Sequence, residues 1–186
     1  MPSIFDNFPE GLSADMLQKL KSNVTTKQVS KGQILLRKGE KVGKAYFVRS
    51  GCLRSYAIDE KGKEHVFMFA PEGWIITDIG AHIHDKPAEL FIDALEDSEV
   101  EVFNSELFSQ FNEHNHNAIM RLLKRNYVLQ KRIIMLMSAT LQERYLDFIE
   151  TYPDIVQRVP QKMIASYLGV TPEALSKVRS ELAKKP

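Results

Sequence analysis

A series of short β-rich runs between Val24 and Phe103 constrains the fold of this 186-residue chain more than any other feature. Turn signals separate the runs, and the clearest of them, Asp59–Gly62, is typical of a β-hairpin. Many short strands at this spacing indicate an antiparallel sandwich or barrel. A short helix over residues 12–22, capped by Ser13, is expected to precede the strands. The runs are QILLR, KAYFVRS, CLRSYAI, EHVFMFA, ELFIDAL and EVEVF.

The segment from Asn104 to about Thr140 contains neither glycine nor proline, and its N-cap and acidic first turn predict a long helix. Within it, β-branched residues or Asn alternate with Leu at the spacing of a parallel two-stranded coiled coil, in which a lone buried Asn126 would fix the register. The predicted dimerisation seam comprises Ile119, Leu122, Asn126, Leu129, Ile133 and Leu136, and Thr140 continues its spacing.

A second apolar stripe lies beside this seam, at Met120, Leu123, Tyr127, Ile134 and Leu141. A helix that is apolar on two faces favours two partners, which here would be its own β-domain and a second copy of the chain. The alternative interpretation is an ordinary amphipathic helix that packs on its own domain alone.

The stretch VPQKMIASYLGVTPEALSKVR, residues 159–179, carries the signals of two short helices joined by a turn. Pro160 suits the start of the first helix, and Gly169 can adopt the left-handed conformation that ends it. Thr171 can cap the second helix, in which Pro172 suits the first position. The pattern predicts a helix-turn-helix that binds DNA. The residues expected to contact DNA are Gln161, Lys162, Thr171, Glu173, Ser176, Lys177 and Ser180.

The charge distribution agrees with a DNA contact at this end of the chain. From Arg158 onward, six basic and two acidic residues give a formal charge of +4, against +1 for the whole chain. Such an excess favours contact with an anion, although solvated surface lysines would give a similar distribution. We expect Glu173 and Lys177 to contact base edges, and the helix starts at Thr171, Gln161 and Lys162 to contact phosphates.

The order of these segments resembles the Crp–Fnr (catabolite-activator-like) family of transcription regulators. VSKGQILLRKGEKVGKAYFVRSGCLRSYAIDEKGKEHVFMFAPEGW resembles the family's opening strands, ALEDSEVEVF their close, and VPQKMIASYLGVTPEALSKVRSEL its DNA-binding segment. The resemblance implies an α+β fold with a cyclic-nucleotide-binding-type, antiparallel double-stranded β-roll sensor over residues 1–103, a dimerisation helix over 104–140 and a helix-turn-helix domain over 141–186. It also implies a homodimer that binds double-stranded DNA, with RNA polymerase as a further candidate partner.

The chain departs from the family pattern in its candidate effector pocket. Family members that bind cyclic nucleotides carry Gly-Glu and, a few residues on, an Arg followed by Ser or Thr. Here Thr77-Asp78 and Ala88-Glu89 stand at the matching places, so the charge-assisted contact to a phosphate is missing. We therefore expect an unidentified effector, or none, rather than a cyclic nucleotide.

A second departure lies at the C-terminus. The family usually follows its recognition helix with a β-hairpin wing, which the seven residues after Arg179 cannot form. We expect a helix-turn-helix that lacks a full wing, either as a reduced domain or as a truncated chain. Pro172 replaces a basic residue that reads bases and Ala174 replaces a phosphate contact, so the preferred DNA sequence should differ from that of other members.

His82, His84 and Glu89 suggest an alternative function, a cupin-like metal-binding β-barrel protein or enzyme. In cupins, two imidazoles and a carboxylate supply three metal ligands. The flanking cupin glycines are missing, because Ile76 and Glu96 fall near their places. A polar loop that replaces the phosphate turn is the favoured interpretation. The sequence shows no arrangement typical of catalysis, so neither an enzyme nor a resident cofactor or metal is predicted.

The single cysteine, Cys52, excludes an internal disulfide and favours a reducing cytoplasm. No apolar run approaches the roughly 20 residues that a membrane span needs, and the N-terminus does not resemble a signal peptide. We expect a cytoplasmic protein with no membrane contact.

Overall fold

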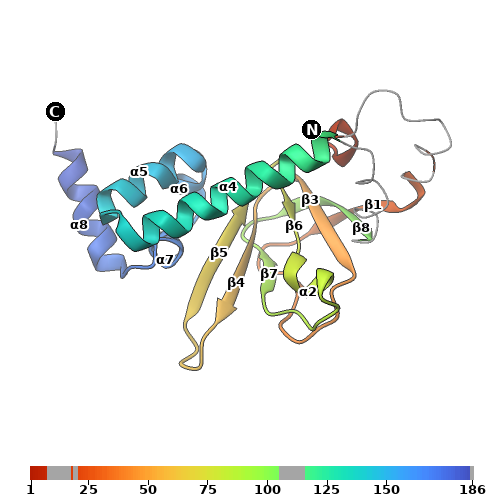
Figure 1. Cartoon of the computed structure of the whole chain (residues 1–186), viewed down its shortest axis with the longest axis horizontal. Coiled ribbons are helices and arrows are strands. Elements are labelled where there is room, and N and C mark those ends of the chain that lie inside the picture. Colours follow the sequence, from red (N-terminus) through yellow and green to blue (C-terminus); the bar gives the residue numbers. More distant parts are fainter. Residues whose placement is uncertain (8–17, 19–20, 105–115, 185–186) are drawn as a thin grey trace. The chain divides into compact units, whose positions relative to one another are not determined.

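A computed structural model describes residues 1–7, 18, 21–104 and 116–184, with the backbone alone for residues 116–125. Figure 1 shows the course of the chain. Its contacts divide it into two compact units. The first unit comprises Met1–Ala57 and Met68–Arg121, and the second comprises Ile58–Phe67 and Leu122–Pro186. The domain boundaries expected from the sequence stay a prediction.

The strands form two four-stranded sheets, with the orders β1-β8-β3-β6 and β2-β7-β4-β5. Neighbouring strands with an assigned register are antiparallel, as the alternation of strands and turns predicts. The strands are β1 Val24–Val29, β2 Ile34–Leu36, β3 Lys44–Ser50, β4 Leu53–Ile58, β5 Glu64–Ala70, β6 Ile75–Ile76, β7 Phe91–Ala94 and β8 Ser98–Asn104.

Alternate side chains of the strands form the core of the first unit. Five aliphatic side chains at its centre are 0% exposed: Val48, Leu53, Ile76, Ile92 and Val100. Burying an aliphatic side chain of this size stabilises a fold by about 1.5–3 kcal/mol. This cluster therefore fixes which face of each strand points inward.

The turn between β3 and β4 requires glycine. Gly51 has φ +88°, and a Cβ atom added there would lie 2.2 Å from Ser98 Oγ and 2.8 Å from Ser98 Cα. Any other residue would combine an unfavourable backbone conformation with a clash. The turn signal Ser50-Gly51 is thus set by close packing against the start of β8.

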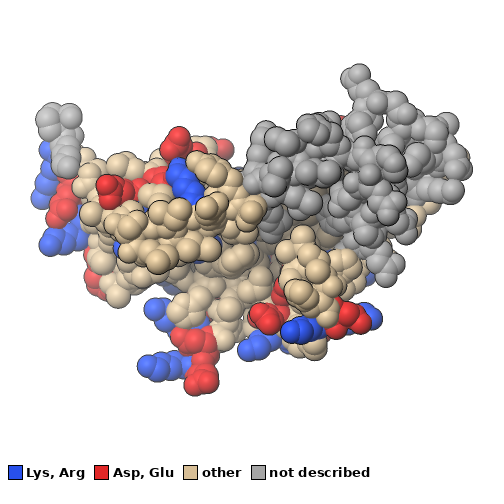
Figure 2. Space-filling model, in the orientation of Figure 1, with Lys and Arg blue, Asp and Glu red and all other residues tan. Residues whose placement is uncertain are grey.

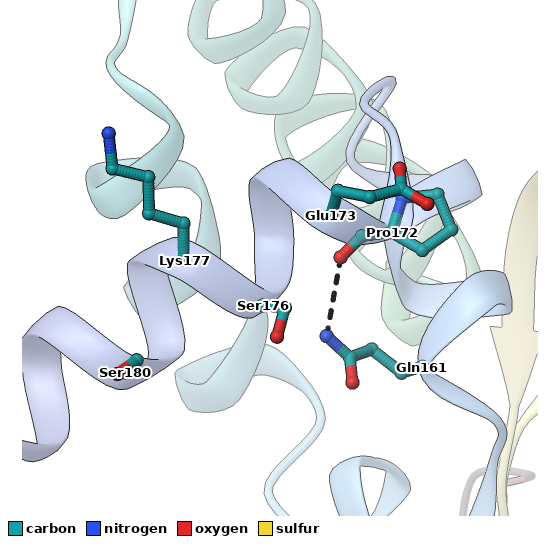
Figure 3. A pocket seen from close by; sticks show the side chains of 6 residues that line it. All are labelled: Gln161, Pro172, Glu173, Ser176, Lys177 and Ser180. Carbon is teal, nitrogen blue, oxygen red and sulfur yellow. Dashed lines mark hydrogen bonds between the residues drawn. The ribbon is translucent and has the colours of Figure 1, made fainter.

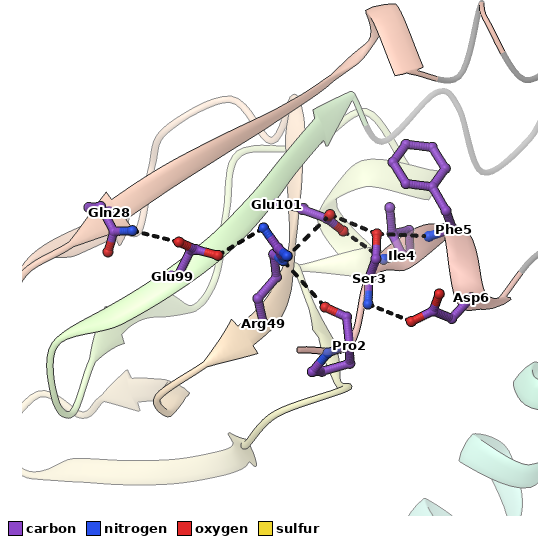
Figure 4. A network of polar contacts seen from close by, with 9 residues as sticks. All are labelled: Pro2, Ser3, Ile4, Phe5, Asp6, Gln28, Arg49, Glu99 and Glu101. Carbon is purple, nitrogen blue, oxygen red and sulfur yellow. Dashed lines mark hydrogen bonds and ion pairs between the residues drawn. The ribbon is translucent and has the colours of Figure 1, made fainter.

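The N-terminal segment is fastened to the first sheet by a polar network (Figure 4). Glu101, which is 5% exposed, accepts hydrogen bonds from Ser3 Oγ at 2.8 Å and from the Ile4 N–H at 2.6 Å. Arg49 Nη1 pairs with Glu99 Oε1 at 2.8 Å. These contacts hold the short 3-10 helix η1, Ile4–Asn7, so that Ile4 packs beside Phe47.

Among the described residues, the α-helices are α2 Ile79–Ile83, α4 His116–Ser138, α5 Leu141–Thr151, α6 Ile155–Arg158, α7 Gln161–Tyr167 and α8 Pro172–Ala183. The expectation that one helix continues to Thr140 was wrong, because α4 ends at Ser138. Thr140 is the N-cap of α5, and its side chain and that of Glu143 form a capping box. Thr140 and Leu141 therefore do not extend the two apolar stripes of α4.

Aromatic side chains form the core of the second unit. Phe148 and Tyr152 of α5 and its C-cap lie 5.3 Å apart between ring centroids, and Phe148 lies 5.2 Å from Tyr167 of α7. Ile164 and Leu175 are 1% and 0% exposed and complete this core. The architecture is a mixed α/β one with antiparallel sheets. The expected helix over 12–22 and the expected cap at Asn104 involve residues 8–17, 19–20 and 105–115, which lie outside the described residues.

Candidate nucleic-acid interface

The turn between α7 and α8 has a specific hydrogen-bonding pattern. Gly169 has φ +71°, its N–H donates to Ser166 O, and the Val170 N–H donates to Ala165 O. This pair of bonds is the Schellman motif that ends many helices at a glycine. The left-handed conformation that the sequence predicts for Gly169 is confirmed.

The start of α8 is fixed by its cap. Thr171 has extended backbone angles, its hydroxyl accepts a hydrogen bond from the Ala174 N–H at 3.3 Å, and Pro172 occupies the first helical turn. Leu175 anchors the helix because its side chain is fully buried. Ala165 of α7 is also 0% exposed, and its small side chain allows another helix to approach closely. The two helices therefore form a defined pair, called here the α7–α8 pair.

An open groove of about 520 Å³ runs along the exposed side of the α7–α8 pair (Figure 3). Gln161 Nε2 donates to Pro172 O at 3.4 Å and so joins the start of α7 to the start of α8. Glu173 and Lys177 leave α8 on one side, one turn apart. The groove is lined by Gln161, Pro172, Glu173, Ser176, Lys177 and Ser180.

Five of the seven residues that the sequence assigns to DNA contact line this groove. The other two lie beside it on the same pair of helices. Lys162 is exposed in the first turn of α7, and Thr171 is exposed with its hydroxyl engaged in the cap of α8. The structure thus brings five of the seven predicted residues onto one surface.

Charges of both signs lie along α8, the helix that supplies most of the groove. Figure 2 shows basic and acidic side chains alternating along this helix. Hydrogen bonds from the Glu173 N–H and from the Thr171 side chain lower the pKa of the Glu173 carboxyl group. Glu173 is therefore a carboxylate at neutral pH, able to accept but not to donate a hydrogen bond.

Arg132 of α4 holds the C-terminal end of α7 together with strand β5. Arg132 Nη2 donates to Tyr167 O at 3.0 Å and to Val66 O at 3.2 Å, and Nη1 donates to Phe67 O. The guanidinium lies 3.9 Å from the centroid of the Tyr167 ring. We call these contacts the Arg132 clasp.

Ser166 adds to the same attachment. Its hydroxyl donates to Glu64 O at 2.8 Å and accepts from the Val66 N–H at 2.9 Å. Arg144 of α5 donates to Leu168 O at 2.8 Å. The sequence analysis missed the clasp, and the one signal available was an arginine between the apolar positions of the predicted dimerisation helix.

One side of α4 exposes large apolar side chains. Tyr127 is 64% exposed, Ile133 57%, Ile134 54% and Met137 82%. The sequence analysis did not single out Met137. These four residues are called the outward face of α4.

The predicted seam residues are distributed around the helix. Asn126 is exposed, Leu129 is half-buried and Leu136 is 41% exposed. Leu136 Cδ2 would lie 3.5 Å from a Cβ atom on Gly169, so Leu136 faces its own unit. Ile119 and Leu122 lie in α4, but their side chains are outside the described residues.

The candidate effector residues are engaged in internal contacts. Thr77, Asp78 and Ala88 are 7%, 6% and 3% exposed, whereas the Glu89 side chain is exposed. Thr77 Oγ1 donates to Lys44 O at 3.0 Å, and the Asp78 carboxylate accepts from the Glu89 N–H at 2.9 Å. The Asp78 side chain therefore contacts the backbone of Glu89. The two side chains do not face a ligand together.

The alternative metal site finds no support in the described residues, among which no three His, Cys, Asp or Glu side chains are placed to hold an ion. His82 and His84 lie at the end of α2 and at its C-cap. Glu89 lies beyond the next turn with its side chain exposed. The three residues follow one another along the chain without converging.

Comparison with known proteins gives a consistent result. The cyclic nucleotide-binding domain family matches residues 26–115. The chain is 26% identical to electron transport regulator A of Shewanella oneidensis, over 95% of this chain and 76% of that protein. It is 28% identical to the fumarate and nitrate reduction regulatory protein of Escherichia coli, over 85% of this chain and 68% of that protein.

The fold is similar to that of FixK2 from Bradyrhizobium japonicum. The two structures align with a TM-score of 0.71 and 19% identity, over 86% of this chain and 84% of that one. Within the part of the chain that the structure describes, no helix has the length and apolarity to cross a membrane.

Proposed function

The chain belongs to the Crp–Fnr family of transcription regulators, with a cyclic nucleotide-binding-type domain, and from this we propose that it is a homodimeric DNA-binding regulator. Its α7–α8 pair is the helix-turn-helix, and α8 is the recognition helix. The observation that carries the proposal is the groove on α8, which gathers five of the seven residues expected to contact DNA. The proposal includes no catalytic step.

The groove suggests how DNA is read. Lys177 can donate to guanine O6 and N7, and Glu173 can accept from the amino group of cytosine. Their i, i+4 spacing lets both side chains reach neighbouring base pairs from one side of α8. Lys162, Thr171 and Gln161, at the starts of α7 and α8, would meet phosphate oxygens and orient the helix pair.

Dimerisation through the outward face of α4 completes the proposal. Four large apolar side chains that remain exposed on one side of a helix favour a protein partner, and a second copy presents the same face by two-fold symmetry. Asn126 and Gln130 are exposed on the same side and supply polar positions that can specify register. Two copies would place their recognition helices about 34 Å apart, in successive major grooves of a palindromic site.

The first unit is the sensor in this proposal. It senses an unidentified effector, or none, rather than a cyclic nucleotide, since Ala88 and Glu89 offer no cation to a phosphodiester. Contact with RNA polymerase and a cytoplasmic location stay predictions.

Single substitutions test the assignment of α8, once sequences that the protein binds have been selected from random DNA. Lys177→Ala and Glu173→Ala should each reduce discrimination at particular base pairs by about 1–3 kcal/mol. Lys162→Ala should instead weaken binding to all sequences alike and lower the salt slope by about one unit.

Lys61→Ala provides a charge-matched control, because Lys61 is an exposed lysine at the hairpin tip of the same unit. It should leave both the base preference and the salt slope unchanged. Identical base preferences for Lys177→Ala, Glu173→Ala and the unmodified protein would show that α8 does not read DNA.

A further inference from the structure

The carboxylate of Asp78 is surrounded by backbone N–H groups. Oδ1 accepts from the Ala81 N–H at 3.2 Å, and Oδ2 accepts from the Glu89 N–H at 2.9 Å and the Leu90 N–H at 3.1 Å. The first donor lies in α2, but the other two are consecutive residues immediately before β7, eleven and twelve positions along the chain. Asp78 is therefore more than a helix cap, because one carboxylate joins two separate segments.

The loop that presents these donors is held in place by contacts that do not involve Asp78. The Ala88 N–H donates to Glu40 O at 2.8 Å, and Ala88 O accepts from the Gly39 N–H at 2.8 Å. The Lys86 N–H donates to Ala81 O at 2.9 Å and closes the end of α2. The N–H groups of Glu89 and Leu90 would consequently keep their direction if the carboxylate were removed.

The surroundings of this carboxylate are those of a bound anion. Asp78 is 6% exposed, and its three hydrogen bonds all come from backbone N–H groups. Successive backbone N–H groups that point to one spot form the usual cradle for a phosphate or carboxylate oxygen. A buried donor left without an acceptor costs about 1–3 kcal/mol, so this loop needs an anion or an equivalent acceptor at that spot.

We propose that Asp78 is a resident anion, an internal carboxylate that occupies the place where this turn would hold an oxyanion and that closes the turn to external anionic ligands. Asp78 thereby determines specificity, because the sensor takes no phosphate or carboxylate ligand at this turn while the carboxylate is present. This obstacle to binding an anionic ligand is separate from the missing cation at Ala88. Restoring a basic residue alone would leave the N–H groups of Glu89 and Leu90 already occupied. The inference does not depend on whether α8 reads DNA.

Chemical rescue of Asp78→Gly tests the proposal, with the full chain and with thermal unfolding as the readout. The substitution removes the carboxylate and leaves space for formate, HCOO⁻, beside three free N–H donors. We expect the midpoint of unfolding to fall, and to rise again by several degrees in sodium formate relative to sodium chloride at equal ionic strength. The unmodified protein should show the same midpoint in both salts.

Thr77→Val is the matched control. It removes the neighbouring buried contact to Lys44 O without leaving an unpaired donor. It should lower the midpoint but give no difference between formate and chloride. A folded Asp78→Gly protein that responds to formate no more than Thr77→Val does would overturn the proposal.

Hydrogen exchange of individual amides decides the matter if Asp78→Gly does not fold. Asp78→Asn keeps the shape of the side chain, but its amide group must turn an NH₂ toward at least one of the donors. We expect at least one of the Ala81, Glu89 and Leu90 N–H groups to exchange at least tenfold faster in this variant, while the Ala88 N–H, bonded to Glu40, is unchanged. Equal protection of all three N–H groups in both proteins would overturn the proposal.

Discussion

Replacing Arg132 by alanine should destabilise the second unit more than any exposed substitution on the same helix. The guanidinium donates to three backbone carbonyls, of Val66, Phe67 and Tyr167, and stacks on the Tyr167 ring. A hydrogen bond from a charged donor contributes about 1.5–3 kcal/mol, and a partly exposed cation–π contact about 0.5–1 kcal/mol.

These contributions share one side chain and are not additive, so we expect a loss of about 3–4 kcal/mol. The loss also leaves β5 attached to α7 through Ser166 alone among the contacts described above. Arg132→Lys should recover less than half of this, because an ammonium group cannot reach three carbonyls in the geometry of the guanidinium fork.

Urea unfolding followed by circular dichroism measures the effect, since helices dominate the signal of the second unit. Lys61→Ala, an exposed substitution in the second unit away from α4, is the control and should change stability by less than about 0.5 kcal/mol. Unfolding midpoints of Arg132→Ala and Lys61→Ala that coincide would refute the role of the clasp.

Further predictions concern backbone strain, pH and assembly. Gly51→Ala should destabilise the first unit by about 2–4 kcal/mol, because a Cβ atom would lie 2.2 Å from Ser98 Oγ. Gly32→Ala, also at positive φ but with open space around it, should cost only about 1 kcal/mol. Thermal unfolding of the two variants measures the difference. A hydrogen bond from His65 and others from the Lys63 and Lys61 N–H groups lower the pKa of Asp59. The stability that the Asp59 carboxylate contributes to the hairpin is therefore fully present above the ordinary pKa of Asp. It is lost as the pH falls through the lowered pKa of Asp59 in the folded protein. Protection of the hairpin amides, measured by NMR between pH 5 and pH 2, should fall in the unmodified protein and stay constant in Asp59→Asn. Ile133→Lys should shift sedimentation from dimer to monomer by placing like charges against each other across the two-fold axis, whereas Leu146→Lys, at another exposed apolar position, should not. A monomeric unmodified protein at micromolar concentration would end the dimer proposal.

The parts of the fold that the sequence predicts best are those with local causes. The runs KAYFVRS and EHVFMFA coincide with β3 and β5, because residues with strand propensity and alternate burial are bounded by clear turns. Gly169 and Thr171 were assigned correctly for a similar reason, since a positive φ and a side-chain cap are properties of single residues.

The end of α4 shows where pattern reasoning went wrong. The 3-4 spacing continues through Thr140, and no glycine or proline marks the break. However, Thr140 and Glu143 have the spacing of a capping box, which already indicated the start of a new helix. The short strand β6 was also missed, because two residues are too few to show a periodicity.

The contacts that fix the candidate sites could not be predicted from local patterns. Arg132 meets Val66 from 66 positions away in the chain, and Asp78 meets Leu90 across a loop whose path the sequence does not reveal. Sequence reasoning placed Thr77-Asp78 and Ala88-Glu89 in one candidate pocket. It could not show that Asp78 turns its carboxylate onto the backbone of the second pair.

The central claim is that a dimer of this chain reads DNA sequence through α8. Fluorescence anisotropy with a labelled palindromic duplex, chosen by selection from random DNA, and with a scrambled duplex of the same composition, tests it most directly over 50–200 mM salt. The account predicts two chains per target duplex, and binding to the target at least about 10³-fold tighter than to the scrambled duplex at physiological salt. It also predicts that affinity for both duplexes falls as salt rises. Equal affinity for the two duplexes across the whole salt range would contradict it.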